Sequence, residues 1–233
     1  MVVNHKRVER LVRLHGLGAK KKTKRIRSRL ETSAPIEVTR VNEGWSMDFL
    51  SDRLDSGLSY RILAVIDRRS RECIGLEPAR AMTARRVVEI LDRIAAERGL
   101  PVSIRVDNGP EFDSHALREW ATKNGVQLEF ITPGRPTENG HIESFNGRLR
   151  QECVGLWWVE SLTDARDVLG EWKDRYNNER THSAIGTTPA SYAASAPRVA
   201  YRAPGSRPDG KEENASAFSS FPQAPLQTTN MTT

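Results

Sequence analysis

The alternation of apolar and polar residues between positions 45 and 78 predicts three consecutive β-strands. WSMDFLSD (45–52) alternates inward and outward positions, and the turn signal Asp55-Ser56-Gly57 leads to the apolar run YRILAVID (60–67). RECIGLEP (71–78) is a third stretch of strand character. Because the connections are short, we expect the three strands to form an antiparallel meander.

After residue 82, helical and strand patterns alternate. Thr83 is placed to cap a helix with one apolar stripe, which ends at Gly99 and Pro101, and VSIRV (102–106) follows as a buried strand. Ser114 is placed to cap the next helix, which stops at Asn124-Gly125. VQLEFIT (126–132) is the fifth predicted strand.

Two more helices are expected after a Pro-rich loop at 133–136. One covers about 138–152, with Ile142, Phe145 and Leu149 on one side. The other begins at Ser161, where Asp164 three residues later resembles a capping box. The order βββαβαβα plus a helix indicates one α/β domain.

Composition divides the chain into three parts. Residues 1–40 carry a net charge of +9, whereas the rest carries −3, and NHKRVERLVRLH (4–15) predicts a short basic helix with a basic arm behind it. Residues 41–196 contain the strand and helix patterns. Residues 197–233 are rich in Ser, Pro, Gly, Thr and Asn with few aliphatic residues, which predicts a disordered tail.

The basic arm favours a polyphosphate partner. KKKTKRIRSR (20–29) places seven cations in ten residues. Such a run binds nucleic acid by releasing counterions from phosphates, although a solvated charged face has the same composition. The candidate DNA contacts in this arm are Lys20, Lys21, Lys22, Lys24 and Arg25.

Other features exclude several protein classes. The chain has no apolar run near the length of a membrane span and no export leader, so we expect a cytoplasmic, nucleoid-associated protein without a membrane partner. Cys73 and Cys153 lack metal-like spacing and are expected to be buried or idle thiols in a reducing compartment.

Three carboxylates could converge from separate elements. Asp48 lies in the first strand, Asp107 follows the fourth, and Glu143 lies early in a helix. Clustered carboxylates repel one another unless a cation sits between them, and hard oxygen ligands favour Mg²⁺ or Mn²⁺. Two such ions, with Asp48 shared between them, would activate an attacking oxygen and stabilise a leaving oxygen in phosphodiester chemistry.

The sequence motifs around these acids resemble those of a known family. W-x-x-D stands at 45–48, a strand ends in Ile66-Asp67, and D-N-G-x-E-F occupies 107–112. G-x-P-x-E-N-G-x-x-E-S-F follows at 134–145, and Y-N-x-x-R-x-H closes the series at 176–182. The chain resembles the catalytic core of the retroviral-integrase superfamily, and within it the second-frame product of insertion-sequence transposases of the insertion-sequence-three type.

The resemblance implies a ribonuclease-H-like fold, a five-stranded mixed sheet flanked by helices. It implies Asp48, Asp107 and Glu143 as the catalytic triad. It also implies hydrolysis at element ends followed by strand transfer into target DNA, by a homo-oligomer acting on double-stranded DNA. An upstream-frame product carrying a helix-turn-helix is an expected partner, because family members commonly have that segment ahead of the word that begins here at Asn4.

Further residues are candidates for DNA contact. The superfamily places basic residues after the helix glutamate, which singles out Arg148 and Arg150; Arg148 also fits a plain solvated helix face. His141 could position a phosphate or have no catalytic role. Asn108 could orient Asp107, contact a phosphate or simply form the turn.

Several other residues have competing explanations. Among neighbouring acids, Asp67 is expected to end a strand and Glu111 to serve a turn. Trp157-Trp158 suits core packing or a subunit contact better than base stacking. Arg180 and His182 fit DNA contact and a cationic helix end equally well.

The leading hypothesis is therefore a Mg²⁺-dependent DNA transposase. The alternative is a non-catalytic or truncated DNA-binding product that regulates or inhibits transposition. An RNA-cutting ribonuclease H is disfavoured because the third acid is a helix glutamate within a transposase-like block, at Glu143.

Overall fold

The computed structural model describes residues 5–14, 36–132 and 136–205. The chain divides into two compact units, Met1–Glu31 and Thr32–Thr233. In the first unit, helix α1 covers His5–Leu14, so the predicted basic helix is confirmed. The five candidate residues of the basic arm, from Lys20 to Arg25, lie outside the described residues.

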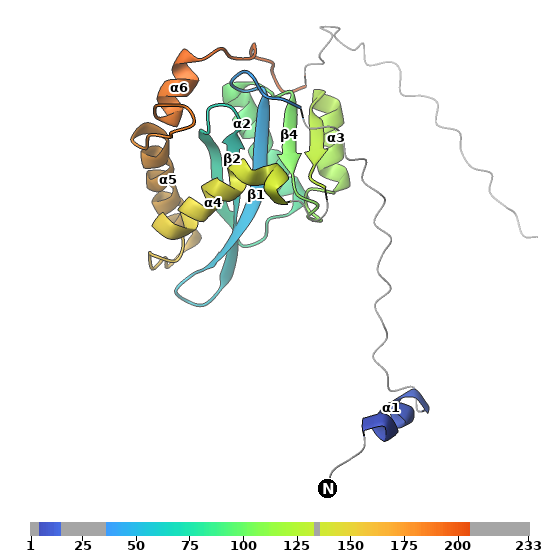
Figure 1. The fold of residues 1–233 in the computed structure, drawn as a ribbon. Coiled ribbons are helices and arrows are strands. Elements are labelled where there is room, and N and C mark those ends of the chain that lie inside the picture. Colours follow the sequence, from blue (N-terminus) through green and yellow to red (C-terminus); the bar gives the residue numbers. More distant parts are fainter. Residues whose placement is uncertain (1–4, 15–35, 133–135, 206–233) are drawn as a thin grey trace, which may run out of the picture. The chain divides into compact units, whose positions relative to one another are not determined.

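The second unit is built on a five-stranded sheet in the order β3-β2-β1-β4-β5. Strands β1 (Gly44–Arg53), β2 (Ser59–Asp67) and β3 (Cys73–Ala79) form the predicted antiparallel meander. Strands β4 (Ser103–Val106) and β5 (Gln127–Phe130) join it in parallel to β1. The sheet is therefore mixed, with β1 at its centre (Figure 1).

Helices α2 (Ala84–Arg98) and α3 (His115–Asn124) pack together, against β3 and β5 respectively. Their predicted caps are confirmed: the Thr83 hydroxyl accepts from Arg86 N–H, and the Ser114 hydroxyl accepts from Leu117 N–H. Gly125 ends α3 in the left-handed conformation, with φ 58°.

The second layer consists of α4 (Gly140–Glu152) and α5 (Leu162–Asn178), with α4 preceded by the short 3-10 helix η1 (Pro136–Asn139). Figure 1 shows α4 crossing β1. One apolar core joins the two helices to the strands. It includes Ile62 and Ile66 from β2, Ile142, Phe145 and Leu149 from α4, and Leu169, Trp172 and Tyr176 from α5. Each such side chain contributes about 1.5–3 kcal/mol on burial, which fixes α4 on the sheet.

A buried ion triad joins the end of β2 to β4 and β5. Arg68 lies just after β2, and its Nη1 is 2.8 Å from Oε1 of Glu129 on β5, with 6% and 3% of the two side chains exposed. Arg105 on β4 donates to the other oxygen, Oε2 of Glu129, at 2.7 Å. The Glu129 carboxylate thereby pairs with both buried arginines.

Two sequence expectations need correction, and one helix was not predicted. The core unit begins before residue 41, because Arg68 Nη2 donates to the carbonyl of Ile36 at 2.8 Å. Helix α6 (Pro189–Ser195) was not predicted, although Thr188-Pro189 is a cap followed by a first-turn proline. The prediction of a disordered tail from residue 197 is wrong for residues 197–205.

Residues 197–205 are held against the core by backbone and side-chain hydrogen bonds. Val199 N–H donates to the carbonyl of Val41, the Tyr201 hydroxyl donates to the carbonyl of Ala96, and Arg202 donates to the carbonyl of Pro101. Polar backbone contacts of this kind leave no apolar periodicity in the sequence. Within the described ranges, no helix is both long and apolar enough to cross a membrane.

Candidate active site

Asp48 and Asp107 lie side by side at the centre of the sheet. The parallel ladder between β1 and β4 ends with the pair Ser46 and Arg105, and Asp48 and Asp107 each follow this pair by two positions. The charge of Asp107 acts on Asp48. Two carboxylates far apart in the chain therefore meet through strand register.

The Asp48 carboxylate points toward α4. Asp48 shares its strand face with Leu50, which belongs to the core under α4. Its Oδ2 accepts a 2.7 Å hydrogen bond from Nδ2 of Asn146, and its Oδ1 accepts one of 2.7 Å from Phe49 N–H. Burial, with the charge of Asp107 adding to it, raises the pKa of Asp48 despite these bonds.

The Asp107 carboxylate is held by the turn that follows it. Gly109 N–H donates to Oδ1 of Asp107 at 2.8 Å, and a Cβ at position 109 would lie only 2.8 Å from that oxygen. Asn108 does not orient Asp107: its Nδ2 donates to the carbonyl of Ile131 at 2.9 Å, which ties the turn to the end of β5. The Oδ1 of Asn108 is buried without a hydrogen-bond partner.

Glu143 lies on the same side of α4 as Asn146, one helical turn earlier, and its side chain is exposed. Arg150 continues this face, and its charge lowers the pKa of Asp48, opposing the effect of burial. As the side chains are placed, no three Asp, Glu, His or Cys residues of the described ranges form a group that could hold a metal ion. The structure thus pairs Asp48 with Asp107, and leaves Glu143 exposed on the helix.

The donor set suits a divalent cation in its chemistry. Asp48 and Asp107 are two hard oxygen ligands. Burial raises the pKa of Asp48 and the charge of Asp107 adds to the effect, and a cation between the two carboxylates would oppose both. Asn146 has a second polar atom, Oδ1, that is buried with no hydrogen-bond partner. A third carboxylate would have to come from an exposed side chain such as Glu143, which changes rotamer readily.

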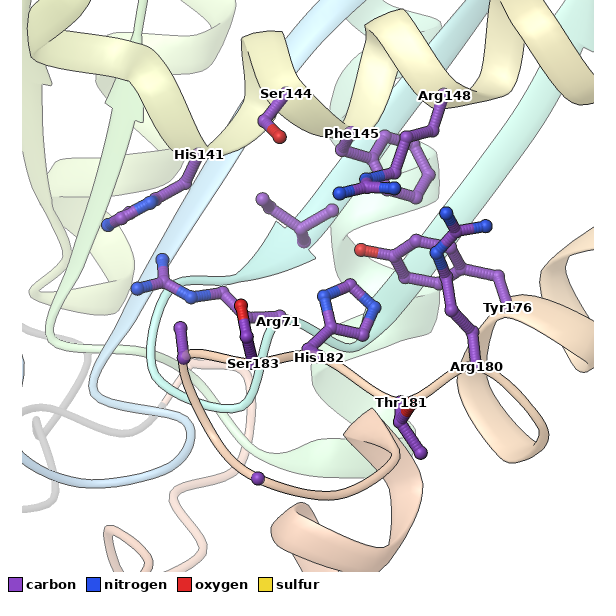
Figure 2. Close-up of a pocket in the computed structure, with 13 residues that line it drawn as sticks. Arg71, His141, Ser144, Phe145, Arg148, Tyr176, Arg180, Thr181, His182 and Ser183 are labelled. Atoms are coloured by element: carbon purple, nitrogen blue, oxygen red, sulfur yellow. The ribbon is translucent and has the colours of Figure 1, made fainter.

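His141 and Arg148 face a different place. Together with Arg71 they line a pocket of about 630 Å³ on the other side of α4 (Figure 2). Burial, with the charges of Arg71, Arg68 and Arg105 added, lowers the pKa of His141 to about 4. Neither His141 nor Arg148 is therefore part of the Asp48 face.

The competing acids have structural roles. Asp67 is buried at the end of β2, where its carboxylate accepts from the backbone N–H groups of Asn42, Arg69 and Ser70, so its role as a strand end is confirmed. Glu111 forms an ion pair with Arg61 of β2 and so does more than serve its own turn.

The tryptophan pair does not pack in the core. Trp157 and Trp158 are 56% and 86% exposed, so the core-packing explanation is wrong for both.

Comparison with known proteins identifies the fold and its family. Residues 38–136 and residues 124–189 match models of an integrase core domain. The 31.7 kDa protein of insertion element IS407 from Burkholderia multivorans is 40% identical over 192 residues, which make up 82% of this chain and 69% of that protein. The chain belongs to the integrase-core family. The resemblance predicted from the sequence is confirmed.

Two further likenesses define this integrase core. The 39.2 kDa protein of insertion element IS476 from Xanthomonas euvesicatoria is 39% identical over 193 residues, and the chain spans 56% of that relative's length. The HTLV-2 integrase catalytic core domain in complex with magnesium, in its trimeric form, matches 65% of this chain and 96% of that one with a TM-score of 0.52 at 18% identity. The fold is thus ribonuclease-H-like, as the resemblance implied.

Sequence reasoning missed two contributors to these sites. Asn146 stands three residues after Glu143 in the same block, and that spacing on one helix face was the available signal. Arg71 had no signal, because only the fold brings the turn between β2 and β3 beneath α4.

Proposed function

We propose that this chain is the catalytic core of an insertion-sequence transposase, which hydrolyses and transfers phosphodiester strands of double-stranded DNA with divalent metal ions. The observation that supports this most is the Asp48–Asp107 pair, adjacent through the β1–β4 register and flanked by α4. Asp48, Asp107 and Glu143 are the proposed catalytic and metal-binding residues.

Each residue has a distinct task in this proposal. Asn146 and Phe49 N–H each hold one oxygen of Asp48, and Gly109 N–H holds one oxygen of Asp107. Each carboxylate oxygen has two lone pairs, so both groups keep acceptor capacity for a ligand. Glu143 supplies the third carboxylate from an exposed position on α4. Arg150, on the same helix face, attracts the DNA strand to the acids.

Asp48, Asp107 and Glu143 would hold Mg²⁺ or Mn²⁺. We propose two ions, the number predicted from the sequence. When bound, such ions lower the pKa of an attacking water or 3′-hydroxyl and stabilise the leaving oxygen. One solved neighbour, the HTLV-2 integrase catalytic core domain, is a complex with magnesium. That neighbour is a trimeric form, which supports the proposal that this chain also acts as an oligomer.

Cleavage and strand transfer of DNA carrying the element's ends test the proposal. Wild-type protein should cut in Mg²⁺ or Mn²⁺ and not in chelator, and Asp107→Asn should abolish cutting without weakening DNA binding. Asp113→Asn is a matched control, because Asp113 lies in the same segment and pairs with Arg118. Retained cutting by Asp107→Asn would reject the assignment, and DNA binding without any cutting by the wild type would favour a regulatory product.

Metal binding is measurable apart from cleavage. If Asp48 and Asp107 form the metal site, Mg²⁺ should raise the melting temperature of the wild type, since a ligand that binds only the native state stabilises it. The increase should vanish in Asp48→Asn and persist in Asp113→Asn. An equal increase in all three proteins would place the metal elsewhere.

A further inference from the structure

Helix α4 presents three different faces. Ile142, Phe145 and Leu149 pack into the core, while Glu143, Asn146 and Arg150 form the acid face. The third stripe, at positions 141, 144 and 148, lines the pocket of about 630 Å³. Positions three and four apart share a face, so one helix serves the acids and the pocket at once.

The pocket is cationic on every side. Figure 2 shows its walls: α4 above, the turn between β2 and β3 to one side, and the segment after α5 below. The charged or polar groups that matter are Arg71, His141, Ser144, Arg148, Arg180 and His182. No Asp or Glu is among the described residues that line it.

Most of this charge has no counterion. Arg71 and Arg148 form no ion pair within the described ranges. Arg180 is the exception, since its Nη1 lies 2.6 Å from Oε1 of Glu152. Two further polar atoms, Nη1 of Arg71 and Nε2 of His182, are buried with no hydrogen-bond partner. A buried unpaired donor costs about 1–3 kcal/mol, more for a charged group, so the pocket gains by accepting an anion.

Arg71 adopts an unusual backbone conformation at this pocket. Its φ is 65°, in the left-handed region that favours glycine, and burial lowers the pKa of its guanidinium. His182 is surrounded by cations: burial, and then Arg148, Arg180 and Arg71, lower the pKa of its ring.

We propose that this pocket binds a phosphate group of the DNA backbone, through Arg71, Arg148 and His182, at a site separate from the carboxylates. The proposal rests on the proposed function, because DNA that crosses over α4 from the acid face, at Glu143 and Arg150, reaches the pocket on the opposite flank of the same helix. Hydroxyl donors on the wall, such as Ser144, suit a phosphodiester oxygen. The contact reads no sequence; it positions the strand. This phosphate contact gives a role to Arg180 and His182, which end the Y-N-x-x-R-x-H motif.

DNA binding by a double variant, Arg71→Gly with Arg148→Gln, tests the site. Glycine suits φ 65°, so the first change should keep or raise the melting temperature. The matched control is Arg80→Gln with Arg85→Gln, which removes the same charge from two exposed arginines outside the pocket. All proteins carry Asp107→Asn, and anisotropy of a labelled duplex is recorded in chelator over a range of salt concentrations.

The pocket variant should bind the duplex about tenfold or more weakly, as expected for two lost charge-assisted contacts. Its salt dependence should fall by about one unit of slope per lost phosphate contact, whereas the control changes affinity and slope less. Affinity and slope equal to those of the control would overturn the inference.

Inorganic phosphate is the second probe and separates a small anion from DNA. It should shift the ring resonances of His182 in the wild type and not in the pocket variant. A phosphate response together with unchanged DNA affinity would overturn the DNA assignment. If wild-type protein cuts DNA but the pocket variant binds it normally, the pocket inference fails and the proposed function stands. If the pocket variant loses DNA binding but the wild type never cuts DNA, the pocket inference stands and the proposed catalytic function fails.

Discussion

Asn146 Nδ2 on α4 donates a 2.7 Å hydrogen bond to Oδ2 of Asp48 on β1, across 98 residues of chain. Asn146 is 2% exposed and Asp48 is half-buried, so the bond is partly shielded from water. It links the helix that carries Glu143 to the strand that carries Asp48. The helix is thereby anchored both by its apolar face and by a polar contact at the candidate site.

Replacing Asn146 should therefore impair catalysis through Asp48. In Asn146→Ala the Asp48 carboxylate loses its fixed orientation, and we expect DNA cutting to fall by about 10–100-fold, as is usual for residues that orient a metal ligand. Asn178→Ala is the control, because Asn178 is exposed and bonds only within α5. Reduced Mg²⁺ affinity with a preserved fold would identify a positioning role, whereas equal effects of both variants would contradict it.

Gly109→Ala should separate activity from stability. The new Cβ would lie 2.8 Å from Oδ1 of Asp107, and the carboxylate, being the end of a side chain, can move aside. The free energy of unfolding, measured in urea, should change by less than about 1 kcal/mol. DNA cutting should fall at least as far as in Asn146→Ala. Gly170→Ala, in α5 with open space around it, should leave cutting unchanged and stabilise the helix by up to about 1 kcal/mol.

Glu129→Gln should be strongly destabilising. Glu129 neutralises both Arg68 and Arg105, and its removal leaves two largely buried cations without a counterion. We expect a loss of about 3–5 kcal/mol in the free energy of unfolding. Glu89→Gln breaks the exposed pair with Arg86 and should cost at most about 1 kcal/mol. A similar small loss in both variants would show that the triad contributes little.

The same residue gives a pH dependence with a definite sign. Burial alone would raise the pKa of Glu129, but hydrogen bonding with Ser103 and the cations Arg68 and Arg105 outweigh it and lower the pKa below 4.5. The native state therefore binds fewer protons than the unfolded state in this range, so the stabilisation is complete above pH 4.5 and declines as pH falls through the lowered pKa. The difference in unfolding free energy between wild type and Glu129→Gln should shrink on acidification.

Both thiols should be unreactive in the native protein. Burial raises the pKa of Cys73 to about 12 and that of Cys153 to about 11, and both side chains are buried. At neutral pH almost no thiolate is present, so iodoacetamide should label neither residue on a timescale that modifies both after denaturation. Mass spectrometry counts the labels. Rapid native labelling of Cys153 would mean that the end of α4 opens in solution.

The pattern of residues predicted the strands and helices well where periodicity and caps agree. Thr83 and Ser114 cap the expected helices, and the antiparallel meander follows from short turns. Helix α6 was missed because it is short and buries only Pro189 and Ala193, although its cap was readable. The packed segment 197–205 was missed because backbone hydrogen bonds and arginine contacts leave no apolar period.

By itself the sequence determined the sheet-forming segments, the integrase-core motifs and the positions of Asp48, Asp107 and Glu143 along the chain. Only the tertiary structure decided that Asn146 bonds to Asp48, that Glu143 stays exposed, and that a turn carrying Arg71 lies beneath α4. The physical reason is that periodicity records which side of an element avoids water. It does not record which polar group, a hundred residues away, that element meets when the apolar sides pack.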